Sequence, residues 1–454
     1  MAPKIIVADL QIFSAYISQS VNQIKLLSSS PSIALKMSDI PSEFYREILL
    51  RLPADSLFRF RTVCKAWRRI IDDPSFIKSH TNNQHSSTTL FIRNPAGTLY
   101  SISLDSLNYI DGLQKIEVIH VKTLSLRGVP RLPALPVASC NGLILISHFE
   151  INKIWVIWNP LTKEFHELPE LDIDEHLKAS GLGYDSASDD YKVVRIDEIW
   201  HNQKLWVNNQ KFYRTLVYSM KSDSWKRIKN CPGDFAIAPI GSDQGFFLNG
   251  ALHWRSRDKI ITLDLATEEY RQLSLPPVPR KPGKPFETYL DALGGCLVVS
   301  FYYIIERLDG WVMKDYGVEK SWTKLFSFGK LDVIGAMQGN LRPVAYFKSK
   351  GQVVLQYYDK FFWLDIEKNI SKKVTILGIP SCFSSQICPG SLFRLSDSVG
   401  GSVALKSTAG VKRKRRNRKK ANTRLHDVII SDIWCRSDSS FSSDSGWLSE
   451  GEDY

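Results

Sequence analysis

The residues able to do acid–base or metal chemistry are spread thinly along the 454-residue chain. It has nine histidines and seven cysteines, and no two cysteines form the Cys-x-x-Cys pair typical of structural zinc sites. The histidines have no metal-ligand spacing, although a closed ring of strands could still gather distant ligands. His253 lies in an alternating apolar stretch, where a packed or hydrogen-bonded histidine is expected. The sequence therefore predicts no metal and no cofactor.

Motifs for covalent catalysis and phosphate binding are not found either. The stretch "GLGYDS" at 181–186 lacks the Gly-x-Ser-x-Gly order of a nucleophile elbow. Its two glycines lack the third Gly and the Lys of a phosphate-binding loop. The adjacent carboxylates Asp189 and Asp190 fit a β-turn. We therefore expect a protein without catalytic activity.

The positive charge is concentrated in one short segment. The net charge is +12, and residues 411–424 hold nine Lys or Arg and no acid, so removing these nine charges leaves +3 for the other 440 residues. A body so mildly basic requires no polyanionic partner, and nucleic-acid binding is not expected. No apolar run approaches the ~18 residues of a membrane span. Scattered cysteines in odd number fit reduced thiols in the cytoplasm or nucleus.

Residues 38–80 are predicted to be helical. Pro41 suits the first position of a helix, and Pro53 is expected to end it. Asp55 or Ser56 can cap the next helix, and "DDP" at 72–74 is expected to close the block.

Two apolar stripes recur at helical spacing: Phe44, Ile48, Leu49 and Leu52, then Leu57, Phe60, Val63, Cys64, Trp67, Ile70 and Ile71. A unit of ~40 residues is near the lower limit for independent folding. Its surplus apolar surface needs either the rest of the chain or a partner's groove.

From about residue 88 the pattern changes to short strands, and repeats become visible. "VIWNPLTKEFHEL" at 156, "LVYSMKSDSWKRI" at 216 and "ITLDLATEEYRQL" at 261 share one plan of apolar pair, polar turn, aromatic and aliphatic. A longer copy at 311 and a degenerate one at 361 follow, giving a mean interval of about 51 residues. Each copy has an apolar strand upstream. This period is close to the ~50-residue kelch blade, so residues 88–398 are predicted to form an all-β propeller of about five to six blades. A two-sheet β-sandwich is the competing architecture.

The two ends of the chain differ from this body. Residues 1–36 read as a leader that is expected to be disordered, with Met37 an alternative start of translation. Residues 399–454 run from Gly/Ser through the basic cluster to a Ser-rich acidic stretch and are also expected to be disordered. Ser449, which acids follow, is a candidate for phosphorylation.

The helical block resembles an F-box, the motif that binds the Skp-family adaptor of cullin ubiquitin ligases. The matching elements are Pro41, the Ile48–Leu49 pair, "RLP" at 51–53, "SLFRFRTVCKAW" at 56–67 and "DPSF" at 73–76, while Ile40 replaces the usual Leu. The resemblance implies an adaptor-binding surface, to which we assign Ile40, Pro41, Leu49, Leu52, Pro53, Leu57, Phe60, Val63 and Trp67. For Cys64 and Ile70 internal packing is the stronger interpretation.

The β-rich body resembles the kelch-like, F-box-associated domain of plant F-box proteins. "SCNGLILI", "IWNPLTKEFHELP", "GLGYDSASDDYKVVRI" and "DYGVEKSWTKLF" carry this resemblance, and "LYSISLDSL" at 99–107 fits the subgroup that includes a regulator of plant immune receptors. The fold class implied is α+β, a small helical F-box followed by an all-β propeller.

The function implied is a non-catalytic substrate receptor of an SCF-type ubiquitin ligase. Its partners would be the adaptor, a cullin and an unknown protein target whose binding residues cannot be assigned. A propeller scaffold without any ligase is the alternative. Lys412, Arg413, Lys414, Arg415 and Arg416 resemble a nuclear import signal, so we expect the protein in cytoplasm and nucleus.

Overall fold

The computed structural model describes most of the chain between residues 42 and 397. The described residues are 42–82, 88–93, 99–104, 122–124, 134–148, 155–171, 176–199, 212–231, 244–256, 259–278, 286–303, 306–329, 341–347, 351–357, 360–368, 370–374 and 384–397. The leader at 1–36 and the tail at 399–454 lie outside them, so their expected disorder stays a prediction.

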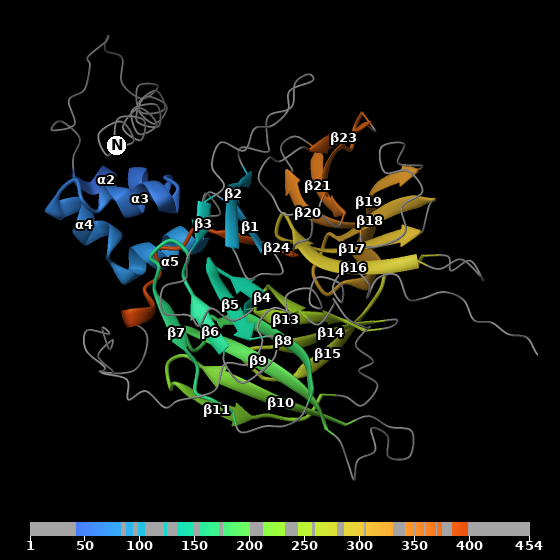
Figure 1. Ribbon diagram of the computed structural model, residues 1–454, viewed down its shortest axis with the longest axis horizontal. Helices are drawn as coiled ribbons and strands as arrows, with labels where there is room; N and C mark the ends of the chain where they lie inside the picture. Colours follow the sequence, from blue (N-terminus) through green and yellow to red (C-terminus); the bar gives the residue numbers. More distant parts are fainter. Residues whose placement is uncertain are drawn as a thin grey trace, which may run out of the picture.

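Within the described residues, four short helices form a helical module at one side of the molecule (Figure 1). They are α2 (Ser42–Leu50), α3 (Ala54–Phe60), α4 (Lys65–Ile71) and α5 (Pro74–Asn82). The N-cap of α3 is Pro53, with no side-chain cap. The Cys64 Sγ accepts the backbone N–H of Trp67 at 3.4 Å and caps α4. The Asp73 Oδ1 accepts the backbone N–H of Phe76 at 3.0 Å and caps α5.

These boundaries correct two expectations from the sequence. Neither Asp55 nor Ser56 caps α3, because the helix already begins at Ala54, directly after the proline. The segment 72–74 opens α5 rather than closing the block, because a proline is well tolerated in the first turn of a helix. The second apolar stripe is also divided between α3 and α4.

Six four-stranded antiparallel units, or blades, follow within the described residues. Blade 1 comprises β1 (Thr88–Arg93), β2 (Leu99–Ser103), β3 (Lys122–Leu124) and β24 (Ser384–Pro389). Blade 2 comprises β4 (Ala134–Cys140), β5 (Leu143–His148), β6 (Trp155–Trp158) and β7 (Phe165–Glu167). Blade 3 comprises β8 (His176–Asp185), β9 (Asp190–Ile199), β10 (Phe212–Ser219) and β11 (Ser224–Arg227).

The remaining three blades continue the same plan. Blade 4 comprises β12 (Gln244–Leu248), β13 (Ala251–Arg255), β14 (Lys259–Asp264) and β15 (Tyr270–Ser274). Blade 5 comprises β16 (Phe286–Leu293), β17 (Cys296–Tyr303), β18 (Arg307–Met313) and β19 (Trp322–Gly329). Blade 6 comprises β20 (Leu341–Phe347), β21 (Gln352–Tyr357), β22 (Lys360–Asp365) and β23 (Ile370–Val374).

The blades form a closed ring (Figure 1). The strand β24, from the end of the propeller, pairs antiparallel with β1 from its start, so both ends of the ring share one sheet. The inner strands β8 and β12 also pair, in parallel, which joins blades 3 and 4. Six apolar cores each lie between two neighbouring blades. A ring of six interfaces is the expectation for a propeller, and the β-sandwich alternative is therefore wrong.

The five copies of the sequence repeat correspond to the third and fourth strands of blades 2 to 6. In blades 2, 3 and 4 the repeated positions face each other directly, as Trp158↔Phe165, Tyr218↔Trp225 and Leu263↔Tyr270. The apolar stretch upstream of each copy is the second strand. The glycines that open these stretches lie in turns with positive φ, such as Gly142 at 83° and Gly250 at 79°. The backbone geometry of the turn explains them, because glycine adopts it without steric cost.

Candidate functional site

The helical module has an apolar core of its own. Its buried members are Leu49, Leu50, Leu52, Ala54, Leu57, Phe60, Trp67, Ile71 and Phe76, and Leu392 joins them from the other end of the chain. The rings of Phe60 and Trp67 lie 5.3 Å apart. The buried His80 hydrogen bonds through Nε2 to the carbonyl of Leu52 at 2.8 Å. Four short helices thus bury most of their apolar residues against one another.

The structure separates the predicted adaptor residues into two sets. Five of them lie in this core with 0–2% of their surface exposed: Leu49, Leu52, Leu57, Phe60 and Trp67. Pro53 is half-buried, and Val63 is 47% exposed. Ile40 and Pro41 lie outside the described residues. The side chains available to a partner in this set are therefore Val63 and, in part, Pro53, while the five buried residues hold the module together.

The corner between α3 and α4 carries the exposed residues. Val63 sits in the turn after α3, and Cys64 and Ala66 beside it are also exposed. Cys64 caps α4 through its sulfur, and Ile70 packs on the module's core. Ile70 therefore has the internal packing expected for it. Cys64 does not pack internally, because it is exposed, and it serves the module by capping α4.

A second apolar face of the module is covered by the propeller. Leu392 is 5% exposed and belongs to the module's core, and Leu161 from the turn between β6 and β7 packs against it. We call this contact between module and propeller the seam. The propeller therefore covers part of the surplus apolar surface that the sequence predicted for the helical module.

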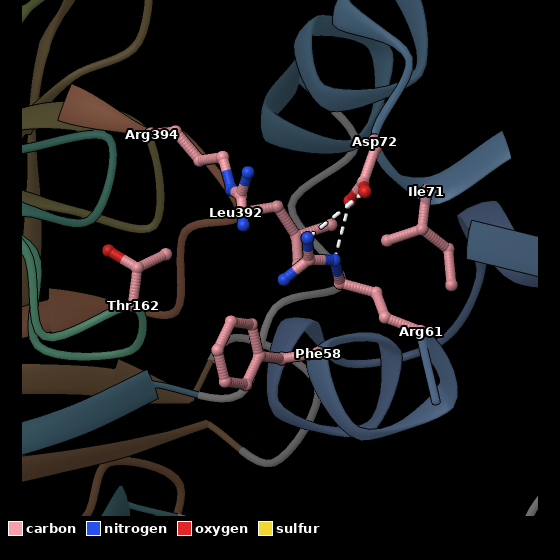
Figure 2. Close-up of a pocket in the computed structure, with 7 residues that line it drawn as sticks. All are labelled: Phe58, Arg61, Ile71, Asp72, Thr162, Leu392 and Arg394. Atoms are coloured by element: carbon pink, nitrogen blue, oxygen red, sulfur yellow. Dashed lines mark hydrogen bonds and ion pairs between the residues drawn. The ribbon is translucent and has the colours of Figure 1, made fainter. Parts of the chain in front are cut away.

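Charged residues line a small cleft along the seam (Figure 2). Arg61 donates to both carboxylate oxygens of Asp72, from Nε at 2.5 Å and from Nη2 at 3.0 Å, and Arg68 Nε lies 3.5 Å from Asp72. Arg394 faces this pair from the propeller side. The cleft has room for about one water molecule, so it is a packing boundary rather than a ligand pocket.

The electrostatics of this cluster favour an ionised Asp72. Burial raises its pKa, but the hydrogen bond and charge of Arg61 outweigh that effect, with a smaller contribution from Arg394. The pKa of Asp72 therefore lies below its usual value. An ionised carboxylate attracts guanidinium groups from both sides of the seam.

A second polar contact crosses the seam at blade 3. Lys78 of α5 lies 2.8 Å from the Asp189 carboxylate, which also accepts a hydrogen bond from the Tyr184 hydroxyl. The hydrogen bonds from Lys78 and then Tyr184 hold the pKa of Asp189 below its usual value. Asp189 does occupy a turn, with φ of 56°, as the sequence predicted, whereas Asp190 already begins strand β9. Its contact with Lys78 was missed, since no local pattern relates two residues so far apart.

Other chemistry is sparse in the part of the chain that the structure describes. No three His, Cys, Asp or Glu side chains gather there into a group that could hold a metal ion. The five cysteines it contains are free thiols. None of the helices within the same residues is long and apolar enough to cross a membrane. His253 is fully buried and its Nε2 lies 2.7 Å from the Tyr316 hydroxyl, the packed and hydrogen-bonded state expected for it.

Comparison with known proteins gives the same two-part organisation. Residues 37–79 match the F-box domain, and residues 91–385 match the F-box associated beta propeller domain. The chain is 29% identical to the F-box protein CPR1 of Arabidopsis thaliana over 420 residues, which covers 87% of this chain and 98% of that one. It is 31% identical to the F-box/kelch-repeat protein At3g23880 of the same plant, over 70% of this chain and 85% of the relative. The chain therefore belongs to the family of F-box proteins that carry an F-box-associated β-propeller domain.

Proposed function

We propose that this protein is the substrate-recognition subunit of an SCF-type cullin ubiquitin ligase. In this role the F-box binds the Skp-family adaptor, the adaptor links to the cullin, and the propeller binds a target protein. The observation that carries the proposal is the pairing of an F-box with a six-bladed propeller in one chain. This pairing supplies one binding element for the ligase and a separate one for the target.

The mechanism would be proximity rather than chemistry by this chain. Holding the target on the same assembly as a ubiquitin-charged conjugating enzyme raises the effective concentration of its lysines. No general acid, base or nucleophile of the F-box protein is needed for that gain. The protein would accordingly act as a non-catalytic subunit.

The F-box contacts suggest which face of the propeller receives the target. The turns that meet the F-box are those between β6 and β7, which carries Leu161, and between β8 and β9, which carries Asp189. Both lie on one face of the ring, because antiparallel neighbours return the chain to alternate faces. We expect the target on the opposite face, where steric overlap with the adaptor is smallest.

A scaffold without ligase activity is the second candidate. The observation that favours it is the seam itself, because Leu392 covers part of the F-box with the chain's own propeller. In this case the helices would serve only as a folded extension of the ring. The two candidates differ in whether the exposed corner at Val63 binds an adaptor.

Adaptor capture by the full chain separates the two candidates. Val63→Glu places a charge on a 47% exposed apolar residue of the F-box, and Val318→Glu does the same at a 50% exposed residue of blade 5. We expect Val63→Glu to weaken adaptor binding by about ten-fold or more and Val318→Glu to bind as the unmodified chain does. A Leu52 variant is less informative, because Leu52 is completely buried.

The controls decide how a negative result is read. Circular dichroism must show that both variants keep their helix and strand content. Failure of the folded, unmodified chain to bind the adaptor and cullin would support the scaffold. Equal binding by all three chains would leave the ligase role standing but remove Val63 from the interface.

The pathway and the location of the protein are further parts of the proposal. The resemblance to the subgroup with a regulator of plant immune receptors supports a target in plant defence. In affinity purifications we expect the adaptor and the cullin to co-purify with the unmodified chain but not with Val63→Glu. Target proteins should co-purify with both chains.

Deleting residues 411–424, which contain Lys412 to Arg416, is expected to lower the nuclear fluorescence of a tagged chain. An unchanged distribution would remove the import role.

A further inference from the structure

We propose that residues 391–397, which follow the ring-closing strand β24, act as a clip that fixes the F-box to the propeller in one orientation. We use "clip" for these residues only. The clip couples closure of the ring to the position of the F-box. The proposal concerns the architecture of the chain and holds whether or not an adaptor is bound.

The clip starts from a strand that is held on three sides. β24 pairs with β1 along its whole length. On the side of blade 2, Ser139 Oγ donates to the Ile387 carbonyl at 2.8 Å, and Gln386 Nε2 donates back to Ser139 Oγ at 2.9 Å. On the side of blade 6, Ser385 Oγ donates to Gln356 at 2.6 Å. The chain therefore leaves the ring at a fixed point beside blade 2.

Hydrogen bonds then hold the clip's backbone against blade 2. Asn159 Nδ2 donates to the carbonyls of Ser391 and Phe393 at 3.0 and 2.7 Å, and Asn159 is completely buried. The Glu164 carboxylate accepts the backbone N–H of Leu395 at 2.8 Å. Both side chains come from the turn between β6 and β7. These bonds satisfy backbone groups that would otherwise be buried without partners.

Successive side chains of the clip point to opposite sides. Phe393 and Leu395 pack into the core between blades 2 and 3, where the Phe393 ring lies 4.7 Å from that of Tyr191. Leu392 packs into the core of the F-box, and Arg394 faces Asp72 across the cleft (Figure 2). From Leu392 to Leu395 this alternation is the pattern of an extended segment that is covered on both faces. The clip then ends in the 3₁₀ turn Leu395–Asp397, where Ser396 and Asp397 are exposed. The clip thus contributes Leu392 and Arg394 to the side of the F-box, and Phe393 and Leu395 to the side of the propeller.

Two other contacts cross the seam: Leu161 packs against the core of the F-box, and Lys78 pairs with Asp189. The ion pair is the weaker of the two. The side chains of Lys78 and Asp189 are 52% and 56% exposed, and ion pairs in water contribute little to stability. The orientation of the F-box therefore depends mainly on the clip and on the turn between β6 and β7 that holds it.

Two glycines in equivalent turns provide a matched test. Gly142 and Gly250 each follow an asparagine between the first and second strands of a blade, with φ of 83° and 79°. A Cβ on Gly142 would lie 2.3 Å from Ser391 Cβ and 2.7 Å from the Pro389 carbonyl oxygen, whereas a Cβ on Gly250 would meet nothing within 4 Å. Gly142→Ala and Gly250→Ala therefore share the backbone strain, and Gly142→Ala alone displaces the clip.

The readout is the distance between the F-box and the propeller in the full chain. Fluorophores attached through unnatural amino acids at Arg69 and Lys229, both exposed, report it by single-molecule energy transfer. We expect one narrow distance population in the unmodified chain and in Gly250→Ala. In Gly142→Ala the population should broaden and shift to longer distances.

A second variant keeps the test decisive if Gly142→Ala does not fold. Leu392→Ala removes the clip's apolar contact with the F-box without straining the backbone. It should broaden the same distance, or lose the helical signal while the β-signal remains, because the F-box then lacks part of its core. A narrow, unchanged population in a folded Leu392→Ala chain would overturn the proposal, as would a broad population in the unmodified chain.

Discussion

At the scale of single residues, burial decides what a predicted site residue does. Leu57 was assigned to the adaptor surface, yet none of its surface is exposed. Leu57→Ala should lower the free energy of unfolding of the F-box by about 2–5 kcal/mol. Val63→Ala, at the exposed corner, should change it by less than ~0.5 kcal/mol. Urea unfolding followed by helical circular dichroism measures both. Similar stabilities would mean that Leu57 is not a core residue.

The sequence could not separate these two roles. An apolar residue at helical spacing marks a buried face, but in a module of four helices of seven to nine residues several faces are buried at once. Val63 and Leu57 belong to the same stripe. The sequence did not predict that α3 ends at Phe60. The turn that follows exposes the Val63 side chain to solvent.

His253 links the stability of blade 4 to pH. Burial lowers its pKa to about 4, and the backbone groups of Phe246 and Ala251 offset only part of that effect. The unfolded chain therefore binds a proton near pH 6.5, before the folded chain does, so stability falls as the pH falls from 6.5 towards 4. The shift corresponds to roughly 3 kcal/mol.

The variant His253→Gln isolates this contribution. Glutamine carries no charge at any pH and can still hydrogen bond to the Tyr316 hydroxyl. Chemical unfolding between pH 6.5 and 4 should show a smaller loss of stability for His253→Gln than for the unmodified chain. Parallel pH curves for the two chains would contradict the buried neutral histidine.

At the scale of elements, close packing inside a blade sets which glycines are replaceable. A Cβ on Gly310 of β18 would lie 2.3 Å from the Phe326 ring, whereas one on Gly329 of β19 would meet nothing within 4 Å. Gly310→Ala should destabilise the chain by about 1–3 kcal/mol through overpacking. Gly329→Ala serves as the control in the same blade. Equal melting temperatures of the two variants would contradict this packing.

The elements also show how far the sequence determines the fold. The hairpin of third and fourth strands was predictable because its signal is local, an apolar residue and an aromatic across a short turn. The upstream second strands were predictable for the same reason. The bulge at Gly310 and Trp311 and the parallel pairing of β8 with β12 were not, because each depends on neighbours distant in sequence.

At the scale of the whole molecule, closure of the ring depends on one strand. Nothing in "SSQICP" at 384–389 specifies β1 as its partner, and the partner becomes evident only once five other blades have set the circumference. The seam was equally invisible in the sequence. The stretch "SLFRLSD" at 391–397 has the composition of a loop, yet Leu392 packs on the F-box while Phe393 and Leu395 pack between blades 2 and 3.

Removing that strand should therefore open the ring. A chain ending at residue 383 would lose β24 and the clip, leaving β1 with an unpaired edge and the cores on both sides of blade 1 incomplete. An exposed edge promotes aggregation, so we expect loss of the cooperative thermal transition and of soluble protein. A chain ending at residue 398 keeps every described contact and should melt as the full chain does. The two truncations differ only in the fifteen residues that contain β24 and the clip. If both chains showed the same cooperative transition, the ring would close without β24, and the F-box and the ring would be stabilised separately.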